Sequence, residues 1–296
     1  MNILIIGFGH AGKAYLKSIQ NINTIKKIHI IDINEKLSEK FPFNVSFSKS
    51  CPEEIFDIGI VCTPPITHLD VLKKYIKYTK KIIIEKPIAL ENEETNEIFD
   101  IAKQNKVFFS IHSMYGKELL FSKNKLNNLK QNSYITQLFY DPYCFHDSNH
   151  LGGPFWDSIY NAIGIVYFTF GNFEIDKIQI SKDDSFSFEM NAIFNFKSIS
   201  AIYNLTINWD KPANLKFTEI LDPQLQNGLL INHNQQCISD LSGENMEQDP
   251  FQIYRLATHY KKVLLECIND YDFESNNRMA KNISKQVLKI NKARKN

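Results

Sequence analysis

The sequence predicts an α/β protein in two parts, a doubly wound parallel sheet followed by an α/β domain with a largely antiparallel open sheet. Three observations support this. Over about the first 110 residues, short apolar runs alternate with amphipathic helical patterns, which is typical of a parallel sheet covered by helices. The apolar runs lack polar alternation, which indicates strands buried on both faces. After about residue 130, strand-like runs follow one another with turns between them, which favours antiparallel pairing.

The first part contains five apolar runs that we expect to be strands: Asn2–Ile6, Lys27–Asp32, Phe56–Cys62, Lys80–Ile84 and Val107–Ile111. Apolar residues at helical spacing predict helices between them, one beginning near Ala11 and two more over Leu69–Tyr78 and Glu93–Gln104. The boundary lies somewhere within 112–131, and we divide the chain into residues 1–115 and 116–296.

The second part begins with a strand over Ser133–Asp141 and a helix over Pro154–Phe170, for which Gly171 is the stop signal. Phe186–Phe196 and Ile199–Ile207 are further strands. Two helices close the chain, over Phe251–Ile268 and Asn276–Ile290, and we leave open whether they pack back on the first domain.

Composition excludes several classes of protein. The formal net charge of +1 argues against a general affinity for nucleic acid or an anionic membrane. Five widely spaced cysteines without a CxxC pair favour neither a zinc ribbon nor a disulfide framework, and they fit a reducing compartment. The stretch Ser158 to Phe173 is shorter than the ~20 apolar residues of a spanning helix. With no signal-peptide pattern at the start, we expect a cytoplasmic protein.

A glycine motif, GxGxxG, follows the first strand directly and opens a helix, which is the context that dinucleotide binding requires. Gly7 permits the tight turn, Gly9 lets the backbone approach a pyrophosphate, and Gly12 allows close packing of helix on strand. Unpaired N–H groups at the helix N-terminus would receive the phosphates. We expect the whole run to bind the cofactor: Gly7, Phe8, Gly9, His10, Ala11 and Gly12. The alternative is a glycine turn without a ligand.

Asp32 lies 20 residues after Gly12, at the end of the second strand. An acidic residue at this spacing accepts hydrogen bonds from the adenosine ribose hydroxyls. Its carboxylate would repel the extra phosphate of NADP, and no arginine occurs before Arg255 to receive that phosphate. We therefore prefer NAD(H) as cofactor without excluding NADP(H).

Two further clusters follow expected strands, at the sheet edge where ligands bind in open α/β folds. The first is Cys62-Thr63-Pro64-Pro65-Ile66-Thr67-His68, in which the prolines stop the strand and Thr67 can cap the next helix. We expect Thr63, Pro64, Pro65 and His68 near the cofactor, although His68 could equally belong to a plain connection. The second cluster is Glu85-Lys86-Pro87. We expect Glu85 and Lys86 to lie at the cofactor, where a partly desolvated Lys86 can share in proton transfer; the alternative is an ordinary solvated lysine at the end of a strand.

In this order and spacing, GxGxxG, TPPxxH and EKP resemble the Gfo/Idh/MocA family of glucose–fructose oxidoreductase and inositol dehydrogenases. The resemblance is strong over residues 1–112 and weaker beyond, through Gly152-Gly153, Asp157 and the two final helices. It implies a Rossmann domain followed by a substrate-binding domain whose open sheet often forms an oligomer interface, here a homodimer or homotetramer. It also implies NAD(P)-dependent hydride transfer, mostly on sugars and polyols, with Lys86 as the catalytic lysine.

The family pattern breaks on the first long helix of the second domain. Family members carry D-x-G-x-H there, whereas this chain keeps Asp157 but has Ile159 for the glycine and Asn161 for the acid/base histidine. Asp157 and Asn161 share a helix face, but asparagine does not titrate. The proton could instead pass through Lys86, Tyr160 or one of His146 and His150.

Other polar and aromatic residues near this break have open roles. His146 and His150 are substrate contacts or plain loop residues, and a metal site with Asp147 is the least favoured reading, so we predict no metal. Trp156 belongs to an aromatic-rich segment that is either core or a stacking surface for the substrate.

These observations predict an oxidoreductase that transfers hydride between nicotinamide and a small molecule: a sugar, amino sugar, nucleotide sugar or cyclic polyol. Lys86 would position and polarise the reacting oxygen, Asp157 would orient Lys86 or the substrate, and Asn161 would hold a hydroxyl group. The alternatives are a reductase of an imine or conjugated non-sugar substrate, a non-catalytic NAD(P)-binding regulator, and a glycosidase-like use of bound NAD.

Overall fold

The computed structural model describes residues 1–34, 41–42, 44–50, 52–111, 131–142, 153–197, 199–222, 227–235, 237–242, 247–248, 255–269 and 272–296. The chain forms two compact units, Met1–Ile111 with Tyr254–Lys281 and His112–Ile253 with Asn282–Asn296. Each unit contains its own sheet. The domain boundary that we expect between residues 115 and 116 lies outside the described residues and stays a prediction.

The first unit is built on a six-stranded sheet in the order β3-β2-β1-β4-β5-β6, in which all neighbours pair in parallel. Its strands are β1 (Asn2–Ile6), β2 (Lys27–Ile31), β3 (Val45–Ser48), β4 (Phe56–Val61), β5 (Thr79–Glu85) and β6 (Val107–Ser110). The sheet confirms the doubly wound prediction, and its order reverses between β1 and β4, where such folds bind ligands. Sequence reasoning missed β3, because four residues that alternate Val-Ser-Phe-Ser give too short a pattern.

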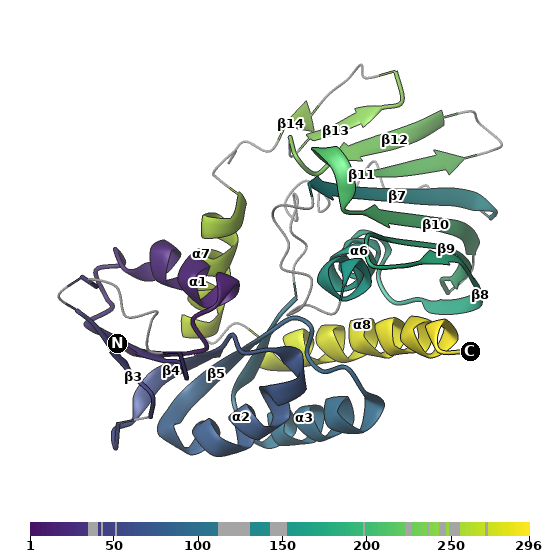
Figure 1. Ribbon diagram of the computed structural model, residues 1–296. Helices are drawn as coiled ribbons and strands as arrows, with labels where there is room; N and C mark the ends of the chain where they lie inside the picture. The colour runs from purple at the N-terminus through teal and green to yellow at the C-terminus, as the bar shows by residue number, and fades with distance from the viewer. Residues whose placement is uncertain are drawn as a thin grey trace. The chain divides into compact units, whose positions relative to one another are not determined.

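Helices cover both faces of this sheet: α1 (His10–Ile19), α2 (His68–Tyr75), α3 (Asn92–Gln104) and α7 (Arg255–Ile268). Figure 1 shows α1 and α7 on one face and α2 and α3 on the other. Short 3₁₀ turns, Pro65–Thr67 and Ile76–Tyr78, flank α2.

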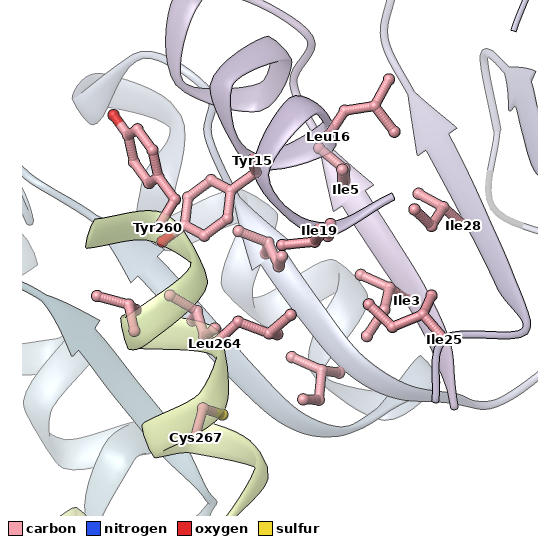
Figure 2. Packing of buried hydrophobic residues seen from close by; sticks show 14 of the residues in the cluster. Ile3, Ile5, Tyr15, Leu16, Ile19, Ile25, Ile28, Tyr260, Leu264 and Cys267 are labelled. Carbon is pink, nitrogen blue, oxygen red and sulfur yellow. The ribbon is translucent and has the colours of Figure 1, made fainter. Parts of the chain in front are cut away.

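The core of the first unit includes residues from both ends of the sequence. Figure 2 shows isoleucines of β1, such as Ile3 and Ile5, beside α1, with Leu264 and Cys267 of α7 completing the packing. α7 therefore belongs to the first unit, although it lies more than 140 residues beyond β6 in the sequence. At the start of α8 (Phe273–Arg294), Asn276 accepts from the backbone N–H of Phe109 and donates to its carbonyl, at 2.8 and 3.1 Å.

The second unit contains an eight-stranded sheet in the order β14-β13-β12-β11-β7-β10-β9-β8. Its strands are β7 (Ser133–Pro142), β8 (Glu174–Asp183), β9 (Ser187–Asn195), β10 (Ser200–Asn208), β11 (Asp210–Asp222), β12 (Asn227–Asn232), β13 (Cys237–Asp240) and β14 (Glu247–Gln248). Neighbours pair antiparallel except for the parallel pair of β7 and β10, which confirms a largely antiparallel sheet. Helix α6 (Pro154–Phe170) packs against this sheet and is bounded by Gly153 and Gly171, both at positive φ (Figure 1).

A line of buried polar side chains crosses the middle of this sheet. The hydroxyl of Tyr203 donates to Gln137, whose amide donates to Thr218 at 3.0 Å, and Thr218 Oγ1 lies 2.8 Å from His233 Nε2. All four side chains are buried. Because buried polar groups cost free energy unless they are paired, this network holds the strands in one register. Among the described residues, no helix is long and apolar enough to cross a membrane.

Candidate functional site

The glycine turn between β1 and α1 is shaped by close backbone approaches. Gly7 has φ +92°, and a Cβ there would lie 2.8 Å from backbone atoms of Cys62 and Thr63, at the end of β4. A Cβ on Gly12 would lie 2.2 Å from the carbonyl oxygen of Gly7. Both glycines are therefore required by the fold, one for the turn and one for the packing of helix on strand.

Gly9 differs from these two glycines because none of the described residues closes in on it. A Cβ at this position would meet no atom of the described part of the chain within 4 Å. Gly9 is exposed at the N-cap of α1, where no side chain caps the helix and no acidic residue occupies the first turn. His10 is exposed beside it, and Ala11 is half-buried. The N–H groups of this helix terminus and its partial positive charge face an open space, which fits a phosphate.

The two neighbours of this space are the backbone of Phe8 and the carboxylate of Asp32. The Phe8 side chain is buried and packs edge-on against Phe41, so only its backbone can serve a ligand. Asp32 follows β2, accepts from the N–H of Phe8 at 2.7 Å and accepts from the N–H of Asn34 at 2.8 Å. These bonds fix the carboxylate beside the glycine turn, and each oxygen keeps a second lone pair for a ribose hydroxyl.

The Thr-Pro-Pro turn after β4 contributes a further candidate contact. The hydroxyl oxygen of Thr63 is buried and has no hydrogen-bond partner among the described residues. Pro64 is exposed and accepts from Thr67 at 2.8 Å, whereas Pro65 is buried at the start of the 3₁₀ turn. Since buried hydroxyls are normally paired, the Thr63 oxygen is suited to accept or donate a bond to a bound molecule.

His68 is placed differently from a cofactor contact. Its ring is fully buried, with Nδ1 3.0 Å from the carbonyl oxygen of Ile88 and Nε2 2.8 Å from that of Thr63. Burial lowers the pKa of His68, while the two carbonyls and the charge of Glu85 act in the opposite direction. Because no ring edge is exposed, we correct the expected role of this residue: His68 links the turn after β4 to the segment that follows Lys86.

Glu85 and Lys86 lie at the carboxyl end of β5, the side on which such sheets bind ligands. Glu85 is only 4% exposed, and its Oε1 accepts from the hydroxyl of Tyr15 at 2.9 Å. Its Oε2 accepts from the backbone N–H of Lys86 at 3.3 Å. Lys86 is half-buried, and the Lys86–Pro87 peptide bond is cis.

Tyr15 is a site residue that the sequence analysis missed. Its ring is one of the buried positions on the helix after the glycine turn, yet its hydroxyl lies between Glu85 and Ser110. Burial and the negative charge of Glu85 raise the pKa of Tyr15 well above its usual value. The signal that could have revealed it is a tyrosine on a buried helix face, since its hydroxyl requires a polar partner.

In the second unit, Asp157 and Asn161 lie four residues apart on α6. Asp157 is half-buried in the first turn, and its N–H donates to the carbonyl of Gly153 at 3.3 Å. Asn161 is 7% exposed, and its Oδ1 has no hydrogen-bond partner within the described ranges. An amide oxygen of this kind can accept a bond from a ligand hydroxyl.

Other candidates on α6 are part of the core. Tyr160 is fully buried with its hydroxyl 3.4 Å from Ser284 of α8, a placement that argues against a proton relay. Trp156 is 7% exposed and packs edge-on against Phe155, which favours the core alternative. His146 and His150 lie outside the described residues. The described part of the chain contains no group of three potential metal ligands.

Comparison with known proteins gives a family match for residues 1–113. Residues 1–113 match the family model of Gfo/Idh/MocA, described as an oxidoreductase family with an NAD-binding Rossmann fold. Biliverdin reductase A of Mus musculus is 20% identical over 105 residues, which cover 34% of this chain and 36% of the mouse protein. The match thus spans about a third of that relative's length.

Solved structures resemble the chain over nearly its whole length. Biliverdin reductase from Synechocystis sp. PCC 6803, in complex with biliverdin and NADP+, has a TM-score of 0.73 at 14% identity and covers 99% of this chain and 98% of its own. Apo scyllo-inositol dehydrogenase from Lactobacillus casei has a TM-score of 0.74 at 18% identity, with coverage of 99% and 95%.

A third structure, UDP-N-acetylglucosamine 3-dehydrogenase from Acidithiobacillus ferrooxidans, has a TM-score of 0.73 at 13% identity, with coverage of 98% and 96%. At these identities the likeness establishes the fold. The family match adds that residues 1–113, the Rossmann part of the chain, are similar to the Gfo/Idh/MocA oxidoreductases.

Proposed function

We propose that the chain transfers hydride between a nicotinamide dinucleotide and a sugar, amino sugar, nucleotide sugar or cyclic polyol. The main support is the turn at Gly9, where a Cβ above the N-terminus of α1 would meet no atom of the described residues. Asp32 is fixed beside it by the N–H of Phe8, at the position of a ribose acceptor. A glycine turn without a ligand would have no need of this combination.

Lys86 is the residue to which we assign the chemistry. NAD(P), when bound, supplies the site that accepts or donates the hydride. A half-buried ammonium group at the end of β5 can donate a hydrogen bond to the substrate oxygen and share its proton as the hydride moves. We still predict that Asp157 and Asn161 contact the substrate. The Asn161 amide would hold a substrate hydroxyl and would not move a proton.

NAD(H) is the cofactor that we favour. A carboxylate at Asp32 disfavours a second phosphate on the same ribose, and the first 254 residues hold no arginine to receive one. The cyanobacterial biliverdin reductase was solved with NADP+, so both cofactors belong in the test. Fluorescence titration with NADH and NADPH should give the lower Kd for NADH, and a lower Kd for NADPH would overturn this preference.

A second candidate is the reduction of a conjugated non-sugar substrate. Two observations favour it: the N-terminal likeness to biliverdin reductase A and the replacement of a titratable residue by Asn161. Hydride delivery to a conjugated carbon moves the negative charge to the far end of the conjugated system, so the balancing proton is added there and need not come from residue 161. Oxidation of NADH with biliverdin, but with no sugar ketone or polyol in a panel, would select this candidate.

The first prediction concerns Lys86. Lys86→Met should lower turnover with the best panel substrate by roughly 10²–10⁴ while NADH still binds. Lys80→Met is the matched control, because Lys80 lies at the other end of β5 and pairs with Asp57 at 2.8 Å. Wild-type turnover in Lys86→Met would refute the assignment, and cofactor binding without turnover on any substrate would favour a regulator.

Assembly and ligand class are part of the same proposal. We propose a homodimer or homotetramer that acts on a small molecule. Light scattering after size-exclusion chromatography measures the mass directly, and a single species near 34.4 kDa would contradict an oligomer.

A further inference from the structure

A buried hydrogen bond joins the helix that follows the glycine turn to the strand that ends at Lys86. We propose that Tyr15 is a positioning residue, which sets the place of Lys86 through Glu85. This inference rests on the proposed function, because it concerns where the ammonium group of Lys86 stands relative to a bound cofactor. Neither the sequence motifs nor the family match assigns a role to Tyr15.

The connection runs through two contacts to one carboxylate. Tyr15 lies in the second turn of α1, the helix whose N-terminus is the open glycine turn. Its hydroxyl donates to Oε1 of Glu85 at 2.9 Å, and Oε2 of the same carboxylate accepts from the backbone N–H of Lys86. Because a helix is stiff over two turns, a fixed Tyr15 hydroxyl fixes Lys86 relative to the turn that would hold the pyrophosphate.

Burial makes this connection rigid. Tyr15 is fully buried and Glu85 nearly so, hence water does not compete for their hydrogen bond. The raised pKa of Tyr15 keeps its hydroxyl protonated, and therefore a donor, at neutral pH. The second hydroxyl nearby, that of Ser110, lies 3.4 Å from the Tyr15 oxygen.

The ring of Tyr15 is held independently of its hydroxyl. It packs against Tyr260 of α7 with ring centroids 4.4 Å apart, and Figure 2 shows the two rings side by side between α1 and α7. Tyr15→Phe therefore removes the bond to Glu85 and leaves the packing in place. Glu85→Asp is the complementary change, which keeps the charge but withdraws the carboxylate by one methylene.

The segment after Lys86 has a separate support. His68 approaches the carbonyl of Ile88, two residues beyond Lys86. Loss of the Tyr15 bond should therefore free Lys86 on one side only, which predicts a misplaced lysine rather than an unfolded loop. A displacement of a reacting group by about 1 Å can lower the reaction rate by as much as ~10²-fold.

The test measures the reactivity of Lys86 without any substrate. The wild type and each variant are treated with N-hydroxysulfosuccinimide acetate, with and without NADH at ten times the Kd measured for that protein, and acetylation of Lys86 is followed by peptide mass spectrometry. In the wild type, NADH should slow acetylation by about tenfold, the limit set by occupancy. In Tyr15→Phe and Glu85→Asp, we expect protection of about threefold or less, with the NADH Kd within about threefold of wild type.

Tyr75→Phe is the matched control, because Tyr75 is also a buried tyrosine of the first unit but lies on α2. In Tyr75→Phe, NADH should slow the acetylation of Lys86 as much as in the wild type. If NADH slows acetylation of Lys86 equally in the wild type and in Tyr15→Phe, the inference is overturned and the proposed function stands. Loss of NADH binding in Tyr15→Phe would have the same two consequences. Absence of protection in the wild type would instead count against the proposed function itself.

Discussion

The two units place polar groups in opposite ways. In the first unit, the site is shaped mainly by backbone: Gly7 and Gly12 allow contacts that a side chain would block, and Asp32 is held by N–H groups. In the second unit, buried polar side chains such as Gln137 bind one another across the sheet, while Asn161 keeps an oxygen without a described partner. A backbone-shaped site depends on a few glycines at fixed spacing, whereas a side-chain network depends on pairs far apart in the sequence.

The largest expected effect separates two glycines of the same motif. Gly12→Ala should destabilise the first unit by about 3 kcal/mol or more, because its Cβ would lie 2.2 Å from the carbonyl oxygen of Gly7. Gly9→Ala should keep wild-type stability, since its Cβ would meet no atom of the residues that the structure describes, but should weaken NADH binding by at least about tenfold, or ~1.4 kcal/mol. Thermal unfolding by circular dichroism and NADH titration measure the two effects. If both variants lose the same free energy of unfolding, Gly12 is not needed for the fold any more than Gly9, and the distinction between the two glycines is wrong.

The next effect tests the network of the second unit. Gln137→Leu should destabilise this unit by about 1–3 kcal/mol, because Tyr203 and Thr218 lose a buried partner. Urea unfolding followed by tryptophan fluorescence reports on it, since both tryptophans, Trp156 and Trp209, lie in this unit. NADH binding should be unchanged. Thr136→Val, on a half-buried position of the same strand, should change stability by less than about 0.5 kcal/mol.

A smaller effect, in the first unit, depends on pH. The pKa of His68 is lowered in the folded protein, so unfolding below its unfolded pKa of about 6.5 takes up a proton. The contribution of His68 to the free energy of unfolding is fully present above pH 6.5. It is lost as the pH falls below this value, by at most ~1.4 kcal/mol per pH unit. His68→Gln should flatten the fall in unfolding free energy between pH 6.5 and 5.5. His10→Gln, at the exposed start of α1, is the control, and an unchanged slope in His68→Gln would contradict the prediction.

The smallest effect returns to the second unit. Asn161→Leu should leave the unfolding free energy unchanged or raise it by up to about 1 kcal/mol, because the Asn161 Oδ1 has no partner among the described residues and a buried amide becomes apolar. Turnover should nevertheless fall, if the amide holds a substrate hydroxyl. Destabilisation by more than about 2 kcal/mol would show that the Asn161 oxygen has a structural partner. The contrast that we draw between Asn161 and the paired polar groups would then be wrong.

This contrast also explains how much could be predicted from the sequence. The glycine turn, Asp32 and the strand that ends at Glu85 follow from local spacing, and the structure places them as local rules require. Tyr15 and His68 could not be assigned in the same way, because their partners lie 70 and 20 residues away. Tyr160 and Trp156 illustrate the same limit: on a helix that is apolar on nearly every side, spacing alone does not tell which side faces the core.

The membership of α7 in the first unit has a consequence for how this protein is made. On a ribosome, the six parallel strands emerge early, but the face of α1 that packs against Tyr260 and Leu264 stays uncovered until some 150 further residues have been translated. A fragment that stops after β6 would expose that apolar face, so the cofactor-binding part is not a separable N-terminal module. Its completion is coupled to synthesis of all eight strands of the second sheet, and the nascent chain must remain soluble through that interval.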